Sequence, residues 1–198
     1  MAKLLYQGHG SYRIITDENI VIYIDPYAGS GYDIKADIIL VTHEHFDHNR
    51  IQLPAKKNTC VIIHSGDALQ NDVYKCFDIK DIHIQAVTAY NSNHDGKNCV
   101  GYMLTFNGIK IYAAGDTSTT KEMKEYSSMD IDYTLLPIDG IYNMDPAEAS
   151  LCADLIGAKH NIPIHMAPGM LFDAGKAEKF TAKNRLIVTP GEQIELNK

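Results

Sequence analysis

The chain has 198 residues, of which 45% are hydrophobic and 22% are charged, as is usual for a soluble globular protein. A chain of this length can bury a sizeable core, and it contains no apolar run near the roughly 20 residues that a membrane-spanning helix needs. Its formal net charge of −7 argues against a general nucleic-acid-binding surface, which normally carries a basic stripe. We therefore expect a single domain over residues 1–198 that contains no membrane segment and acts on a small molecule.

Cysteine usage and the N-terminal sequence indicate a cytoplasmic location. The four cysteines lie far apart and form no Cys-x-x-Cys pair, which is typical of reduced thiols in a cytosolic protein. The first residues contain no apolar stretch long enough for a signal peptide and lead directly into strand-like sequence. These features set no expectation for the oligomeric state.

Short apolar and β-branched runs, separated by turn residues, predict strands through most of the first half of the chain. These strands are expected at residues 4–7, 12–16, 20–24, 37–41, 59–64, 82–89, 100–106 and 109–113. One helix is expected at 67–74. The dipeptide Asn107-Gly108 is a strong hairpin signal and predicts that the last two of these strands pair.

The second half alternates between predicted helices and strands. Helices are expected at 119–126, 145–157 and 176–183, and strands at 133–137, 162–166 and 186–189. Asp145 as N-cap, followed by Pro146 and then Glu148, is a strong helix start. The face expected to be buried in this helix carries Leu151, Cys152, Leu155 and Ile156. Strands followed by strand–helix alternation predict an α/β fold in which two sheets pack face to face with helices outside.

A dense group of metal-binding residue types follows the predicted buried strand at 37–41. The sequence from Thr42 is Thr-His-Glu-His-Phe-Asp-His, so His43, His45, Asp47 and His48 lie on the loop that leaves the strand. Imidazole and carboxylate groups are ligands for zinc, manganese or iron. The alternative is a solvated loop with chance histidines. Because Asp47 and His48 are adjacent, they do not easily point at the same atom as the first pair, which suggests a second metal position.

Three further candidates each follow a predicted strand, where functional sites are usually built. They are His94, Asp116 and His165. Taken singly, His94 could be a turn residue, Asp116 a helix cap and His165 a buried structural histidine. Taken with the loop at 43–48, they give five imidazoles and two carboxylates, enough for a site with two metals.

Other polar residues are placed around this centre. Asp25, at the end of a predicted strand, is expected to orient the 43–48 loop by hydrogen bonds. His9 lies between two glycines that let its backbone approach the pocket closely, and Asn91 and Tyr142 fall on loops that should border it. Structural roles are expected for the remaining histidines, which are His64, His83 and His160.

The sequence resembles the metallo-β-lactamase superfamily, which is marked by a His-x-His-x-Asp-His motif and by later single His, Asp and His ligands. The matching residues are His43, His45, Asp47, His48, His94, Asp116 and His165, and the resemblance covers nearly the whole chain. Shorter matches resemble the branch that contains ascorbate-6-phosphate lactonase. They lie at residues 8–11, 25–26, 114–117, 136–140 and 163–166.

This resemblance implies a four-layered αββα sandwich with two divalent metal ions held at one edge, between the sheets. By analogy, Asp116 bridges the two metals. The first metal takes His43, His45 and His94, and the second takes Asp47, His48 and His165. Superfamily members use zinc most often, and manganese and iron are also known.

The implied activity is that of a dinuclear metal-dependent hydrolase. A metal-bridging hydroxide attacks an ester, lactone or phosphoester-type bond in a small substrate, and residual positive charge favours an anionic or strongly polarised one. Asp47 is the expected catalytic residue, because a free carboxylate oxygen there can orient the hydroxide or pass a proton to the leaving group. Two alternatives remain open: a mononuclear iron dioxygenase of the same fold, and a non-catalytic metal-binding module.

Overall fold

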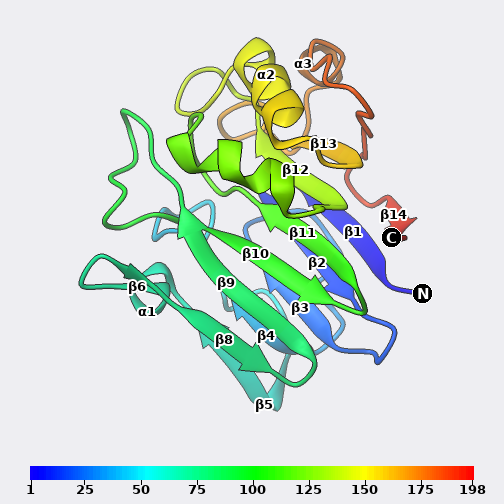
Figure 1. Cartoon of the computed structure of the whole chain (residues 1–198). Helices are drawn as coiled ribbons and strands as arrows, with labels where there is room; N and C mark the ends of the chain where they lie inside the picture. The colour runs from blue at the N-terminus through cyan, green and yellow to red at the C-terminus, as the bar shows by residue number, and fades with distance from the viewer.

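The computed structural model describes residues 1–198 and contains two six-stranded sheets (Figure 1). The first sheet has the order β14 (Gln193–Glu195), β1 (Lys3–Gly8), β2 (Ser11–Ile15), β3 (Val21–Ile24), β4 (Ala36–Leu40) and β5 (Lys56–Ile63). The pairs β3–β4 and β4–β5 are parallel, and the other pairs are antiparallel. The parallel pairs place the C-terminal ends of β3 and β4 at the same edge.

The second sheet repeats this arrangement with later parts of the chain. Its order is β13 (His160–Ile164), β12 (Tyr133–Pro137), β11 (Ile109–Ala113), β10 (Val100–Phe106), β9 (Ile82–Thr88) and β8 (Cys76–Ile79). Strands β11, β12 and β13 are parallel, so their C-terminal ends also share one edge. The predicted hairpin at Asn107-Gly108 joins β10 to β11 and is confirmed.

The main hydrophobic core lies between the sheets, because each sheet turns one apolar face inward. Tyr6 and Ile22 from the first sheet and Tyr102 and Leu104 from the second belong to one buried cluster. In β9 the alternation of buried and exposed residues follows the period of two that a strand imposes. This pattern allowed the strand to be predicted from sequence.

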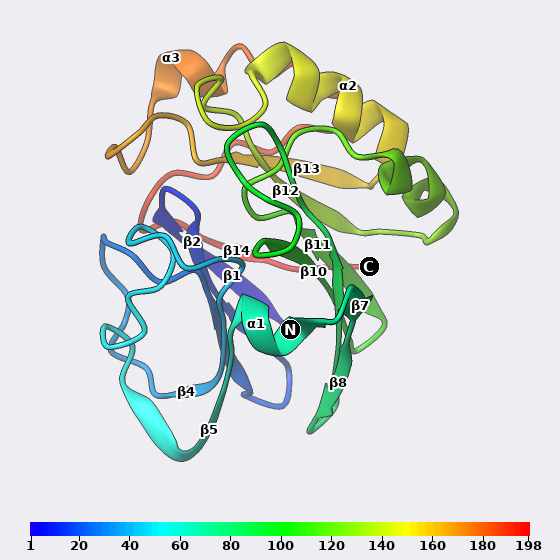
Figure 2. The same ribbon diagram turned by 90° about the vertical axis from the view of Figure 1, so that its left-hand side faces the viewer.

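Helices cover the outer face of the second sheet (Figures 1 and 2). They are the 3₁₀-helix η1 (Lys121–Ser128), α2 (Pro146–Ile156) and α3 (Ala174–Ala177). The outer face of the first sheet is covered instead by loop residues that include Tyr32 and Ile51. The longest α-helix has 11 residues, and no helix combines the length and apolar character needed to cross a bilayer.

The predicted capping of α2 is confirmed. Of its predicted buried face, Cys152 and Ile156 are buried, whereas Leu151 and Leu155 are not. Oδ1 of Asp145 accepts a hydrogen bond from the backbone N–H of Glu148 at 2.8 Å, and Gly157 ends the helix in a left-handed conformation. Leu151 is 72% exposed and Leu155 is 37% exposed. The residues that face the sheet are mostly smaller: Ala149, Ser150, Cys152, Ala153 and Ile156. The two leucines are four positions apart, so they share one face of the helix, and that face points away from the core.

Other differences fall on short elements. The helix expected at 67–74 is only the single turn α1 (Ser65–Ala68), followed by a small hairpin of β6 (Leu69–Gln70) and β7 (Val73–Tyr74). The helix expected at 176–183 is the shorter α3. The last strand is expected at 186–189, but the strand that forms is β14 at 193–195, which pairs with β1.

Asp37, at the start of β4, carries a buried charge that links strands of the first sheet to the turn between β8 and β9 of the second sheet. Its side chain is 1% exposed and lies 2.6 Å from the Lys57 ammonium group, contacts the Lys80 ammonium group, and accepts the Val21 backbone N–H at 3.0 Å. Burial opposes ionisation of the carboxyl group, but the two lysines outweigh it and lower the pKa of Asp37 below its ordinary value of 3.8.

The Asp37→Asn variant is therefore expected to lower the free energy of unfolding by about 1–3 kcal/mol at pH 7. Folding lowers the pKa of this carboxyl group, so the group stabilises the protein at pH values above its pKa in the unfolded state. This stabilisation is lost as the pH falls through its pKa in the folded state. The difference in the free energy of unfolding between wild type and variant should be largest at pH 7 and should decrease below pH 3.8. Urea unfolding at several pH values measures it, and a difference that does not change with pH would contradict the assignment.

Candidate metal centre

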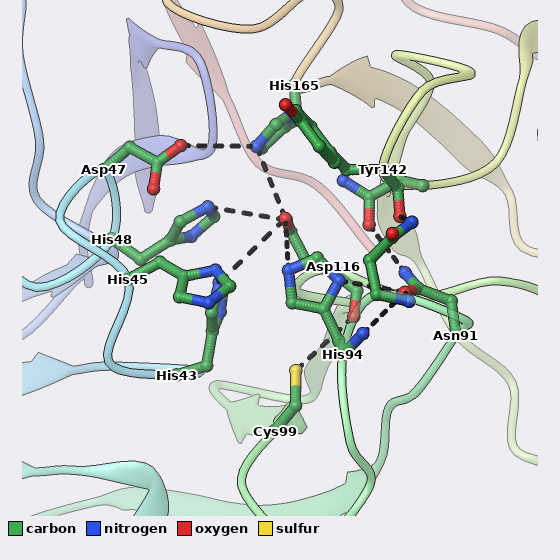
Figure 3. Close-up of polar contacts among 12 residues, drawn as sticks. His43, His45, Asp47, His48, Asn91, His94, Cys99, Asp116, Tyr142 and His165 are labelled. Carbon is green, nitrogen blue, oxygen red and sulfur yellow. Dashed lines mark hydrogen bonds and ion pairs between the residues drawn. The ribbon is translucent and has the colours of Figure 1, made fainter.

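The candidate ligands come from strand ends on both sheets. His43, His45, Asp47 and His48 lie on the loop after β4. The segments after β9, β11 and β13 carry the other three candidates, which are His94, Asp116 and His165. Because the C-terminal ends of the parallel strands meet at one edge, residues that are distant in the sequence come together there. Figure 3 shows these side chains pointing into one space.

Asp116 lies at the centre of this group (Figure 3). Its carboxylate oxygens are 3.3 Å from Nε2 of His94, 3.4 Å from Nε2 of His165, 3.5 Å from Nε2 of His48 and 4.0 Å from Nε2 of His43. The Asp116 side chain is 5% exposed. One buried carboxylate therefore faces imidazoles from the loops after β4, β9 and β13.

The ligand-type atoms form two separate groups and a third group that links them. In each group the atoms lie within 4.8 Å of one another. The first group is His43, His45 and His94, and the second is His9, Asp47, His48 and His165. The linking group is His43, His48 and Asp116. All seven candidates from the sequence are thus brought together, and His9 joins the second group.

Three imidazole nitrogens at this centre are buried without a hydrogen-bond partner. They are Nε2 of His48 and both ring nitrogens of His165, and the two Nε2 atoms face Asp116. Buried polar atoms in proteins nearly always have a partner, so two such atoms facing the same carboxylate require an explanation. A metal ion held by imidazole and carboxylate groups supplies one, because these are the ligands that zinc, manganese and iron accept. The donor set therefore fits a metal.

Two imidazoles of the centre are held by hydrogen bonds at Nδ1. Nδ1 of His48 lies 2.9 Å from Oδ2 of Asp25, and Nδ1 of His94 lies 2.9 Å from Oδ1 of Asn91. An acceptor at Nδ1 fixes the proton there and leaves Nε2 free to bind a metal. Nδ1 of His165 makes a 3.1 Å ion-pair contact with Oδ2 of Asp139.

Asp25 also fixes the start of the motif loop, as expected from the sequence. Its Oδ1 accepts the Thr42 backbone N–H at 2.7 Å, and its Oδ2 accepts the Thr42 hydroxyl at 2.7 Å. The same Oδ2 contacts Nδ1 of His48. One buried carboxylate therefore orients both ends of the loop at 42–48.

The charge state of the imidazoles follows from burial and from neighbouring carboxylates. Burial and the positive charge on His48 lower the pKa of His43 to about 2, so His43 is neutral, the form that binds a metal. Burial opposes charge on His48 as well, but Asp116 and Asp25 raise its pKa to about 9. Burial likewise works against ionisation of Asp116, yet the imidazoles around it hold its pKa well below the usual range. The centre thus stabilises negative carboxylates that attract a cation.

His9 lies deeper in the site than its expected place at the pocket border. It is fully buried, with Nε2 3.1 Å from Oδ2 of Asp47 and Nδ1 3.1 Å from the Met170 carbonyl oxygen. Its ring centroid is 3.8 Å from that of His165. Since Asp47 is the nearest carboxylate to Nε2, His9 serves at least to orient it.

Three residues of the site have left-handed backbone conformations. The φ angles are 57° at His9, 45° at Asp25 and 47° at His165. Such angles are uncommon for residues other than glycine, although His, Asp and Asn adopt them more often than others. Strained backbone of this kind concentrates at functional sites, where the surrounding structure enforces it. The backbone thus contributes to aiming these side chains.

The remaining histidines differ in their surroundings. His83 lies on the surface, where it pairs with Asp78 at 2.7 Å, and His160, at the start of β13, stacks on Tyr133. His64 pairs with Glu44 at 2.7 Å and lines a cavity beside the centre.

Two cavities open onto the candidate centre. The first, of about 700 Å³, is lined by His43, His45 and His94 and by polar residues. The second, of about 490 Å³, is lined by residues that include Asp47 and Tyr142. Both include His45, Asn93 and His94, so they meet at the centre. Tyr142 lies at the border that the sequence predicted.

Asp139 was missed as a site residue by the sequence analysis. Its Oδ1 accepts the backbone N–H groups of Ile141, Tyr142 and Asn143, and its Oδ2 contacts Nδ1 of His165. The backbone hydrogen bonds fix the loop after β12. The available signal was its position just after a predicted strand, the position that marked Asp116 and His165.

The Asp139→Asn variant is expected to bind metal about 10–100-fold more weakly, as is typical when a group behind a ligand is removed. The amide oxygen can still accept the loop N–H groups, but an amide nitrogen facing Nδ1 of His165 disfavours the required tautomer. Competition with a chelating dye measures the affinity. Asp145→Asn at the α2 N-cap is the control, since Asn caps equally well. Equal affinities in the two variants would contradict the role of Asp139.

The fold and this centre place the chain in a known class. The model of the beta-lactamase superfamily domain matches residues 3–165, and the chain belongs to that superfamily. A UPF0173 metal-dependent hydrolase from Thermococcus onnurineus is 30% identical over 99% of this chain and 100% of its own length. One from Pyrococcus furiosus is 31% identical over the same shares. A solved structure from Parabacteroides distasonis is 30% identical, with a TM-score of 0.76, and covers 94% of this chain and 91% of that one.

These comparisons confirm the superfamily and the fold class expected from the sequence. The narrower resemblance to the ascorbate-6-phosphate lactonase branch stays a prediction. The relatives are named as metal-dependent hydrolases, and their names give neither a substrate nor a bond type.

Proposed function

We propose that this chain is a hydrolase that uses two divalent metal ions to cleave an ester, lactone or phosphoester-type bond in a small substrate. The observation that carries the proposal is the buried pair of imidazole nitrogens without hydrogen-bond partners, on His48 and His165, both facing Asp116. The names of the curated relatives, which are metal-dependent hydrolases, support it.

The residues divide between two metal positions that Asp116 faces together. His43, His45 and His94 would hold one ion. Asp47, His48 and His165 would hold the other, with zinc the leading candidate and manganese and iron the alternatives. Bound metals of this kind activate water and polarise a carbonyl or phosphoryl oxygen.

Asp47 is the residue best placed to handle a proton. Its side chain is 20% exposed and lines the second cavity, whereas Asp116 is 5% exposed. One of its oxygens contacts Nε2 of His9, which holds the carboxylate in position. His9 and the other imidazoles around it keep the pKa of Asp47 low despite burial, so it is a carboxylate at neutral pH. We assign it to orienting water and passing a proton to the leaving group.

Removing the metal should lower the thermal midpoint of unfolding, because the proposed ligands span residues 43–165 and both sheets. A ligand that binds only the folded state at 100 times its dissociation constant stabilises it by about 2.7 kcal/mol. Thermal melts of metal-replete protein, chelated protein and chelated protein with metal restored measure the effect. An unchanged midpoint after demonstrated metal loss would contradict a metal that joins the sheets.

Hydrolysis itself is tested with metal-replete protein on a panel of esters, lactones and phosphoesters. Activity that disappears with chelator and returns with metal is expected. A mononuclear iron dioxygenase would show no turnover on the panel and would consume oxygen with a thiol-type substrate, and a binding module would do neither. Either result would overturn the proposal.

A further inference from the structure

The second cavity has an apolar rim over a floor of polar residues. Phe46, from the loop after β4, and Tyr142, from the loop after β12, both line it and are 72% and 48% exposed. Pro168 and Gly169 line it as well, while Asp116 and His165 form part of its floor. An aromatic side chain as exposed as Phe46 loses the stabilisation of burial, so its position at the rim of the cavity is informative.

The Phe46 ring and the Tyr142 backbone are held in place, although both side chains are exposed. The Phe46 ring packs edge-on against Tyr27, with centroids 5.8 Å apart. The Tyr142 backbone N–H donates to Asp139 at 2.6 Å, and the Tyr142 carbonyl accepts from the Asn93 amide at 3.2 Å. The Phe46 ring and the Tyr142 backbone are therefore preorganised, which lowers the entropic cost of binding a ligand.

Further exposed apolar side chains lie on the same loops. Tyr90 precedes the loop that carries His94, Ile141 is next to Tyr142, and Met170 is next to Gly169. They are 38%, 60% and 49% exposed. Ile141 and Met170 thus each adjoin a residue that lines the second cavity. Large exposed apolar patches often mark binding sites.

The charge of the two cavities indicates which part of a substrate each would take. The second cavity is lined by no lysine or arginine, so no cationic side chain there would bind a phosphate. The first is lined by hydrogen-bonding residues that include Glu44, His64, Asp67 and Asn98, with Lys97 its single lysine. The cavities meet at His45, Asn93 and His94, so one molecule can occupy both while its bond lies at the centre.

We infer that the substrate is a carboxylic ester or lactone with an apolar acyl part, which binds against Phe46 and Tyr142, and a polar alcohol part, which binds in the first cavity. The inference rests on the proposed function and names its substrate class. In the reaction, the oxygen of water bonds to the acyl carbon, the bond from that carbon to the alcohol oxygen breaks, and the alcohol oxygen takes a proton. An ester gives a carboxylic acid and a polar alcohol, and a lactone gives one hydroxy acid that carries both groups.

The test is a series of monoacylglycerols with a constant polar alcohol and acyl chains of increasing length. Full burial of one methylene group increases affinity about fourfold. A rim that is open on one side buries each methylene group only in part, so each should increase affinity about twofold. The value of kcat/KM should therefore rise about 16-fold from the acetyl to the hexanoyl ester. The rate at which metal-replete protein releases carboxylic acid from each ester gives kcat/KM.

The Phe46→Ser and Tyr142→Ser variants should flatten this dependence on chain length, and Phe46→Leu should restore most of it. Leu151→Ser, which removes an equally exposed apolar side chain from α2, should leave the slope unchanged. Metal content is measured for each variant, because Phe46 lies between two proposed ligands. Tyr142 lies outside the motif loop and tests the rim independently.

The outcomes separate the two proposals. Ester hydrolysis with a flat chain-length dependence, or a slope that both serine variants keep, would overturn the acyl subsite and leave the hydrolase intact. Turnover of phosphoesters alone would do the same. No metal-dependent turnover of any ester, lactone or phosphoester would overturn the proposed function itself.

Discussion

The His45→Ala variant is expected to lose metal-dependent hydrolysis by more than about 100-fold, whereas His83→Ala should retain nearly the wild-type rate. Removing a group behind a metal ligand already costs about 10–100-fold, and removing a ligand should cost more. His45 lies in the ligand group with His43 and His94. His83 is paired with Asp78 at 2.7 Å on the surface of the second sheet.

These two histidines make a matched pair because both are exposed, so neither substitution opens a cavity in the core. The buried His43 should behave as His45 does, but its replacement also changes packing, and the exposed pair avoids that complication. Steady-state rates, metal content and melting midpoints should be measured together. If His83→Ala were as damaging as His45→Ala, the division of the histidines into ligands and surface residues would be wrong.

Metal-replete protein is expected to contain two metal ions per chain, and His165→Ala should retain only one. A mononuclear centre needs only His43, His45 and His94, so a second set of ligands would then bind no metal. That second set is formed here by Asp47, His48 and His165, together with His9. Losing His165 should therefore weaken the second position before the first.

The metal concentration from elemental analysis, divided by the protein concentration, gives the number of metal ions per chain. His160→Ala, at the other end of β13, is the control, because that side chain stacks on Tyr133 away from the ligand groups. It should keep two metals. A persistent ratio of one iron per chain in wild-type protein would favour the dioxygenase and overturn the dinuclear assignment.

The predictions that succeeded depend on local signals. Helix α2 was placed correctly because Asp145 caps it and Gly157 ends it, and both act within one turn. Likewise, the motif at 43–48 identifies its loop because four ligand-type residues occur within six positions. The turn at Asn71 and Asp72, both with positive φ, was also a local signal, and it was overlooked in favour of a helix.

The predictions that failed depend on distant parts of the chain. Strand β14 has three residues, and it forms because β1 offers an edge about 190 positions earlier, as the pairing of Lys3 with Glu195 shows. Asp139 reaches His165 only because β12 and β13 are neighbours in the sheet. Leu151 is exposed because α2 packs on the protein through the face that carries Ala149, Ala153 and Ile156. None of these relations can be read from residues adjacent in the sequence.

The left-handed backbone at His9, Asp25 and His165 also sets which replacements each position tolerates. A survey of all single substitutions, scored by yield of folded protein, should show a shared profile at the three sites. Asn and Gly should be accepted most readily, because they adopt this conformation at little cost. Valine and isoleucine should be rejected even though the neighbouring strands favour them, because a branched Cβ clashes in this conformation. His165→Asn is therefore a useful companion to His165→Ala, because asparagine separates loss of the imidazole from distortion of the chain.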